Sequence, residues 1–178
     1  MRKIVLVYGV LAGGIIIATI CGTIAVWGGL HEMEGAGQWI GYLVMVIALS
    51  SIFFGVKSYR DNTLGGVIKF KTALLVGVLI TLVASVVYVA GWEGYLAATN
   101  YDFMERYTAS QIEKLKAKGV AGEKLDKAVA DMDYWKELYK NPLLRMAMTF
   151  TEIFPVGLII ALICAAILRK SEVLPARS

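Results

Sequence analysis

The sequence predicts an all-α fold, an integral membrane four-helix bundle with an extramembrane helical hairpin between spans 3 and 4. Hydrophobic residues make up 58% of the 178-residue chain, and the mean hydropathy is +0.65. These residues gather in four long blocks nearly free of charge, which is typical of bilayer-spanning helices of about 20 residues. Residues 93–142 are instead rich in charge, which indicates an aqueous segment. We therefore expect one membrane domain over residues 1–178 with an insert at 93–142.

The first span is predicted over residues 4–27, which hold no charged residue. This apolar stretch is too long for a signal peptide, whose apolar region covers about 7–15 residues. Small residues recur at four-residue spacing and predict a flat face for close helix–helix approach. They are Gly9 with Gly13, and Gly14 with Ala18 and Gly22.

The second and third spans are predicted over residues 39–56 and 72–92. The segment between them, from Lys57 to Lys71, contains Gly65-Gly66 and flanking charges. Such a composition is typical of a turn, so we expect one here at a membrane surface.

The charged segment 93–142 is predicted to form two helices. Thr108–Gln111 resembles a capping box at the start of the first, and Gly119 is suited to its end. An apolar stripe at helical spacing marks the second helix: Leu125, Val129, Met132, Trp135 and Tyr139. The stripe is expected to form the core of the hairpin or to face the membrane. Alternatively, it is part of a surface within residues 101–140 that binds a second copy of the chain or another membrane protein.

The fourth span is predicted over residues 145–168, after a break at Asn141-Pro142. Basic residues near span ends favour one side of the membrane. They comprise Arg2, Lys3, Lys57, Arg60, Lys69, Lys71, Arg169, Lys170 and Arg177. This distribution predicts that both termini are cytoplasmic.

Several segments resemble a known family. They are SIFFGVKSYRD (51–61), GGVIKF (65–70), YKNP (139–142) and TFTEIFPVGL (149–158). Together they resemble the bacterial membrane proteins grouped as domain of unknown function 4199, and the likeness covers essentially the whole chain. The resemblance implies a four-span bacterial protein with an extended loop before the last span, and we expect the protein in the inner membrane. It implies no activity.

Glu152 is the one acid well inside an apolar block, and ionisable groups in spans normally face a partner. Pro155 follows it and predicts a kink beside the carboxyl group. The polar side chains predicted near Glu152, on its own face or at similar depth, are Arg145, Thr149, Tyr88, Thr23 and Ser85. Three interpretations stay open: hydrogen bonding between helices, a proton, ion or substrate site, and a carboxylate that reaches outward. Arg145 either anchors at outer lipid headgroups or pairs with Glu152.

Four cations, Lys57, Arg60, Lys69 and Lys71, are predicted to contact the headgroups of membrane lipids. Asp61 is expected to pair locally with Arg60 or Lys57. No GxxxxGK[ST] pattern occurs, which argues against a nucleotide loop.

The sequence offers little for metal, redox or nucleic-acid chemistry. His31, with Glu32 and Glu34, is the only histidine, and we expect it to be solvated without a metal. Cys21 and Cys164 lie in apolar blocks and are expected to act as small hydrophobic residues. No basic segment interleaved with aromatic residues suggests nucleic-acid binding, and no cofactor is expected.

No set of nucleophile, base and orienting group is apparent, so the sequence favours a protein that is not an enzyme. The leading hypothesis is a structural or accessory subunit that uses a periplasmic hairpin for partner contact. The alternative is a small oligomeric transporter or channel that uses Glu152.

Overall fold

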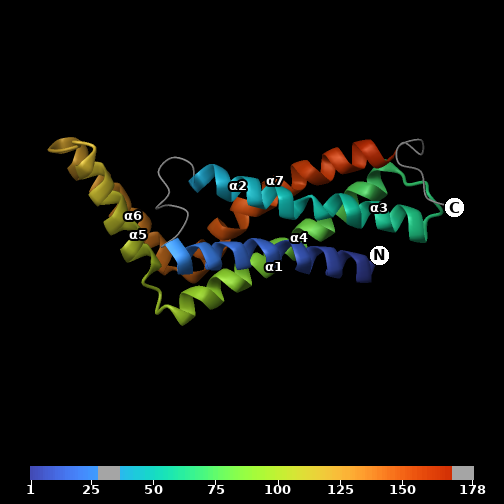
Figure 1. Ribbon diagram of the computed structural model, residues 1–178, viewed down its shortest axis with the longest axis horizontal. Coiled ribbons are helices and arrows are strands. Elements are labelled where there is room, and N and C mark those ends of the chain that lie inside the picture. Colours follow the sequence, from blue (N-terminus) through green and yellow to red (C-terminus); the bar gives the residue numbers. More distant parts are fainter. Residues whose placement is uncertain (28–36, 170–178) are drawn as a thin grey trace. The chain divides into compact units, whose positions relative to one another are not determined.

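The computed structural model describes residues 1–27 and 37–169, and all regular structure in these ranges is helical (Figure 1). The helices described are α1 (Arg2–Trp27), α2 (Gly37–Leu49), α3 (Ser51–Thr63), α4 (Phe70–Ala98), α5 (Phe103–Ala117), α6 (Glu123–Lys140) and α7 (Pro142–Leu168). Four stretches within them are long and apolar enough to cross a membrane: Arg2–Val26, Trp39–Thr63, Phe70–Ala98 and Pro142–Leu168. The all-α prediction is therefore confirmed, and the chain is a multi-pass membrane protein.

The second span is longer than predicted and runs from Trp39 to Thr63. Ser50, between α2 and α3, keeps helical angles (φ −60°, ψ −18°), so the interruption is slight. The predicted turn at 57–71 was therefore too long. Apolar character ends at Val56, but a helix can continue through polar residues, and the left-handed residues Gly65 (φ 69°) and Gly66 (φ 94°) make the actual turn.

The chain divides into two compact units. The first comprises Met1–Gly91 with Phe150–Ser178, and the second comprises Trp92–Thr149. The insert predicted at 93–142 lies inside the second unit, which also includes the last residues of α4 and the first residues of α7.

Glycines allow helices of the first unit to approach closely. A Cβ atom at Gly13 of α1 would lie 2.5 Å from the carbonyl oxygen of Ala84 in α4. A Cβ atom at Gly157 of α7 would lie 2.3 Å from Cγ2 of Thr81, also in α4. Helix α4 is thus in tight contact with both neighbours, as small residues permit in membrane bundles. Gly14, by contrast, has nothing within 4 Å, so only part of the predicted small-residue face is used.

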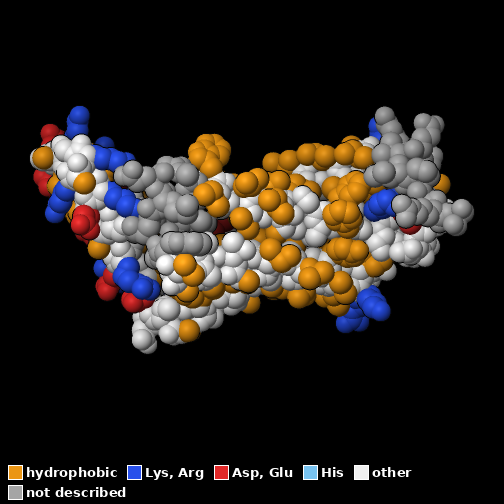
Figure 2. Space-filling model, viewed as in Figure 1, with side chains coloured by type: hydrophobic (Ala, Val, Ile, Leu, Met, Phe, Trp, Pro, Cys, Tyr) orange, Lys and Arg blue, Asp and Glu red, His pale blue; other side chains and the backbone are white. Residues whose placement is uncertain are grey.

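The outer surface of the first unit is apolar. Leu43, Ile47 and Ile159 are exposed by 58–64%. Figure 2 shows hydrophobic side chains along the sides of this unit and Lys and Arg side chains at the end where α1 begins. Exposed apolar surface of this extent is unusual for a soluble monomer but suits lipid tails.

The second unit contains a helical hairpin formed by α5 and α6. Gly119 ends α5 as predicted, since its φ is +78° and the Val120 N–H donates to the Leu115 carbonyl at 3.0 Å. The predicted capping box was wrong. Helix α5 begins at Phe103, and the Thr108 hydroxyl donates to the Met104 carbonyl inside the helix.

Candidate functional site

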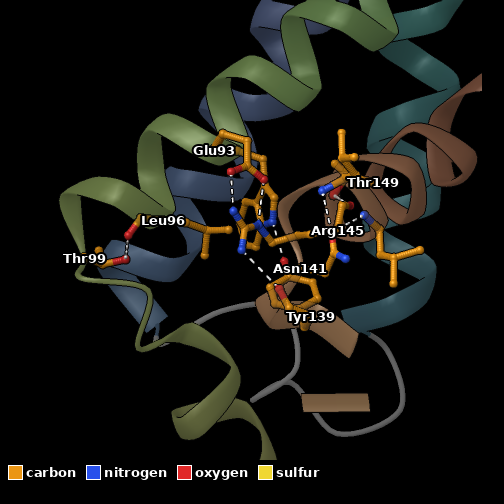
Figure 3. Close-up of polar contacts among 10 residues, drawn as sticks. Glu93, Leu96, Thr99, Tyr139, Asn141, Arg145 and Thr149 are labelled. Atoms are coloured by element: carbon orange, nitrogen blue, oxygen red, sulfur yellow. Dashed lines mark hydrogen bonds and ion pairs between the residues drawn. The ribbon is translucent and has the colours of Figure 1, made fainter. Parts of the chain in front are cut away.

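A buried ion pair joins Arg145 of α7 to Glu93 of α4 within the second unit (Figure 3). Arg145 Nε donates to Glu93 Oε1 at 2.7 Å, and Nη2 donates to Oε2 at 2.6 Å. The Arg145 side chain is 6% exposed and that of Glu93 is 16% exposed. Bidentate arginine–carboxylate pairs are among the strongest charge-assisted contacts in proteins. Each group therefore neutralises the other where water scarcely reaches.

Aromatic residues surround the Arg145 guanidinium. Its Cζ lies 5.0 Å from the centroid of the Tyr101 ring and 5.7 Å from that of the Tyr139 ring. Nη1 donates to the Tyr139 carbonyl at 3.1 Å, and Trp92 Nε1 donates to the Tyr139 hydroxyl at 2.6 Å. Cation–π contacts contribute about 0.5–2 kcal/mol depending on desolvation. These contacts join α4, the α4–α5 turn, the end of α6 and the start of α7.

The start of α7 fixes the position of Arg145. Asn141 Oδ1 accepts hydrogen bonds from the backbone N–H groups of Leu143 (3.0 Å) and Leu144 (3.4 Å), which makes Asn141 the helix cap. Pro142 occupies the first helical position, where its missing N–H costs nothing. The predicted break at Asn141-Pro142 is confirmed, and it places Arg145 in the first turn of α7.

The turn that ends α4 carries backbone strain. Asn100 (φ 53°) and Tyr101 (φ 58°) both adopt the left-handed conformation that residues with a side chain rarely adopt. Such residues cost on the order of 1–3 kcal/mol each and tend to occur at functional sites. The Tyr101 N–H donates to the Leu96 carbonyl at 2.8 Å, which secures the turn. The strained backbone thus holds the Tyr101 ring against Arg145.

A cavity of about 410 Å³ lies beside this ion pair, within the second unit. Apolar side chains that line it come from the end of α4, the start of α5 and the start of α7: Leu96, Met104 and Pro142. Its other lining side chains include Tyr101, Tyr139 and the charged groups of Asp102, Glu105, Lys136 and Lys140. The cavity therefore combines both signs of charge with an apolar floor.

Neither sequence-based interpretation of Arg145 was correct. The residue is buried, so it does not anchor at lipid headgroups, and none of its bonds to described residues involves Glu152. Thr149, predicted on the same face, donates its hydroxyl proton to the Arg145 carbonyl at 3.0 Å, a hydrogen bond within α7. Sequence reasoning missed Glu93 because hydropathy ends at Trp92. The sequence did contain a signal for this pair: Glu93 directly follows the third predicted span, and Arg145 begins the fourth.

Glu152 and Tyr88 form a separate polar contact within the first unit. The Tyr88 hydroxyl donates to Glu152 Oε2 at 3.0 Å, and Tyr88 is 5% exposed. Glu152 as a whole is an exposed residue of α7, although its Oε2 faces the buried Tyr88. Thr23 and Ser85 do not join the pair through any bond described, since each hydroxyl donates to a carbonyl of its own helix.

The predicted headgroup cations have different surroundings. Lys69 and Lys71 are exposed, in keeping with that prediction. Arg60 is completely buried, so the prediction for this residue was wrong. Its Nε donates to Asp61 Oδ1 at 2.7 Å, and Lys57 also pairs with Asp61. The helix continues past Val56, and this continuation turns Arg60 inward.

Metal-binding groups are not assembled in the part of the chain that the structure describes. Among residues 1–27 and 37–169, no three His, Cys, Asp or Glu side chains are placed to hold one ion. His31, Glu32 and Glu34 lie outside the described residues.

Comparison with known proteins identifies the family. No curated protein and no solved structure matches the chain. The model of a family described as "Protein of unknown function (DUF4199)" matches residues 7–170. This match covers most of the chain and agrees with the four apolar helices and the motifs found in the sequence. The chain therefore belongs to the DUF4199 family of proteins of unknown function.

Proposed function

We propose that this protein is a non-enzymatic subunit of the bacterial inner membrane, structural or accessory in role, that binds a membrane protein partner through the α5–α6 hairpin. The ion pair between Arg145 and Glu93 carries this proposal. It fastens the last turns of α4 to the first turn of α7, and the hairpin lies between these two points in the chain. Because the two charges neutralise each other, the role that the pair best supports is structural. It holds the end of α4 and the start of α7 together, and so fixes the two ends of the segment that contains the hairpin.

The hairpin offers an exposed aromatic surface for such contact. Tyr134 and Trp135 of α6 are 61% and 53% exposed, and their rings meet edge to face with centroids 6.0 Å apart. Tyr and Trp are enriched among residues that dominate binding at protein interfaces. No residue of α6 is buried, so the helix has surface available for a partner.

We place both termini in the cytoplasm and the hairpin in the periplasm. Arg2 and Lys3 at the start of α1 and Lys69 and Lys71 beside the α3–α4 turn are exposed. Within the first unit, the start of α1 and the α3–α4 turn lie at the same end (Figure 1). Clustered basic residues favour the cytoplasmic side.

Photo-crosslinking in native membranes tests the hairpin contact. A photoreactive residue is placed at position 134, 135 or, as a control, at the exposed Lys127 of the same helix. We expect positions 134 and 135 to capture the same single protein, identified by mass spectrometry, while position 127 does not. An adduct of twice the chain's mass would identify a second copy instead. If neither aromatic position yields a discrete adduct, the proposal is wrong.

A second candidate function, a small oligomeric transporter or channel, is favoured by Glu152, an exposed ionisable residue within the apolar helix α7. An ionisable group in an apolar span is costly and often marks an ion or substrate pathway. The test is proton and cation flux in proteoliposomes that contain wild type, Glu152→Gln or the control Asp131→Asn, which changes an exposed acid of α6. Flux that depends on Glu152 alone supports transport, and flux unchanged by Glu152→Gln ends this hypothesis.

A further inference from the structure

The cavity beside Arg145 has the chemistry of a site for a small zwitterion. Its volume, about 410 Å³, is in the range of ligand pockets, about 300–1,000 Å³. Besides Arg145, whose charge is neutralised by Glu93, four charged side chains line it: Asp102, Glu105, Lys136 and Lys140. Two carboxylates and two ammonium groups leave no net charge, which favours a ligand that carries both signs over a simple anion or cation.

The two signs come from different helices. Lys136 and Lys140 are four residues apart on α6 and therefore share a helical face. Asp102 and Glu105 lie at the start of α5, three residues apart. The Lys136 Nζ is 3.1 Å from Glu105 Oε1, so the basic and acidic walls are close enough for one small molecule to contact both.

Two charged groups of the cavity, Lys140 and Asp102, are easily released from their present partners. Lys140 pairs with Glu137 and Asp102 pairs with Arg106, and all four of these side chains are 46–69% exposed. Exposed pairs of this kind contribute only about 0–1 kcal/mol, so a ligand can exchange with them at small cost. The buried Arg145–Glu93 pair is different, and it acts as a fixed support.

The location of the cavity favours a lipid. Its apolar lining residues, Leu96 and Pro142, lie where the third candidate span ends at Ala98 and where the fourth begins. Ends of spans lie at the level of lipid headgroups. The strained residues Asn100 and Tyr101 also line the cavity, and backbone strain of this kind is characteristic of ligand clamps.

We infer that this cavity binds the phosphoethanolamine group of a zwitterionic phospholipid. The phosphate lies toward Lys136 and Lys140, and the ammonium group lies toward Asp102 and Glu105. The glycerol end contacts Leu96, Met104 and Pro142. This inference goes beyond the hairpin's protein partner and does not depend on it.

Native mass spectrometry of the full chain in detergent tests the inference. The probes are phosphatidylethanolamine and phosphatidylglycerol with identical acyl chains, and the soluble competitor is O-phosphoethanolamine. We expect phosphatidylethanolamine to bind at least about tenfold more tightly than phosphatidylglycerol, a difference of about 1.4 kcal/mol. The double variant Asp102→Asn/Glu105→Gln should lose this preference. The charge-matched control, Asp131→Asn/Asp133→Asn, changes exposed acids of α6 and should keep it.

A second variant, Lys140→Gln, tests the phosphate wall and should weaken binding of both lipids, because both contain a phosphate. Lys140 is exposed, so this variant is expected to fold even if the double variant does not. If O-phosphoethanolamine displaces phosphatidylethanolamine when both are at the same concentration, the natural ligand is the free molecule. If it does not displace the lipid, the natural ligand is the lipid headgroup. The inference would be overturned if the wild type bound both lipids equally well. It would also be overturned if the control Asp131→Asn/Asp133→Asn lost the preference for phosphatidylethanolamine as fully as the double variant Asp102→Asn/Glu105→Gln.

Discussion

Arg145 and Glu93 are 52 positions apart in the chain, yet they bind each other through two hydrogen bonds of 2.6 and 2.7 Å. The residues between them include the whole α5–α6 hairpin. One buried contact therefore closes the loop to which the hairpin belongs. Its removal should affect stability far more than the loss of a surface ion pair.

Glu93→Gln should lower the free energy of unfolding by about 3–5 kcal/mol, because it leaves the buried Arg145 without a compensating charge. The matched control is Glu105→Gln, which removes a carboxylate that pairs with Lys136 and is 68% exposed. That change should cost at most about 1 kcal/mol. Unfolding in mixed micelles with increasing SDS measures both. Equal losses in the two variants would show that the buried pair is no more important than a surface pair.

Asn100 offers a test of the strained turn, because it is exposed and its φ is 53°. Asn100→Val should destabilise the protein by about 1–2 kcal/mol, since a β-branched residue is poorly accommodated in the left-handed region. Asn100→Gly should stay within about 0.5 kcal/mol of the wild type, because glycine adopts this conformation freely. The same SDS titration compares the two. A Val variant as stable as the Gly variant would mean that the turn relaxes to another conformation.

Two adjacent glycines of α1, Gly13 and Gly14, allow the effect of helix packing on stability to be measured separately from the effect of helix propensity. Gly13→Ala would place a methyl group 2.5 Å from the Ala84 carbonyl oxygen, which is backbone and cannot easily move, so we expect a loss of about 1–3 kcal/mol. Gly14→Ala meets nothing within 4 Å and should be neutral or stabilising by up to about 1 kcal/mol. Thermal unfolding in detergent distinguishes them. Similar melting temperatures for the two variants would contradict close packing of α1 on α4.

The spans could be predicted from sequence because their signal is local. A helix satisfies its own backbone in lipid, so a long charge-free block is sufficient evidence for one. The ends of the helices could not be read the same way. The predicted spans end at Val56 and Trp92. The helices continue to Thr63, through a polar stretch, and to Ala98, past the charged Glu93, because such residues keep the same backbone hydrogen bonding.

The candidate site was harder to predict because its contacts join distant segments. Periodicity relates residues within one helix, so it correctly grouped Arg145 with Thr149 but could not find Glu93. The strained conformation of Tyr101 has no sequence signature, since tyrosine is not a turn residue. The pairing of Glu152 with Tyr88 followed from comparing depths in two spans, which is the one long-range inference that a membrane allows.

Glu152→Leu should increase the stability of the single chain in lipid nanodiscs. Glu152 is an exposed residue of the apolar helix α7, and an ionisable group costs at least about 2.5 kcal/mol at the centre of a span. The substitution also removes the hydrogen bond from Tyr88, worth about 1 kcal/mol. Tyr88→Phe removes that bond alone and serves as the control, with an expected loss of about 1 kcal/mol. If Glu152→Leu is instead less stable than Tyr88→Phe, the carboxyl group is covered in the membrane by a polar partner, and an oligomer built on this face of α7 becomes the better explanation.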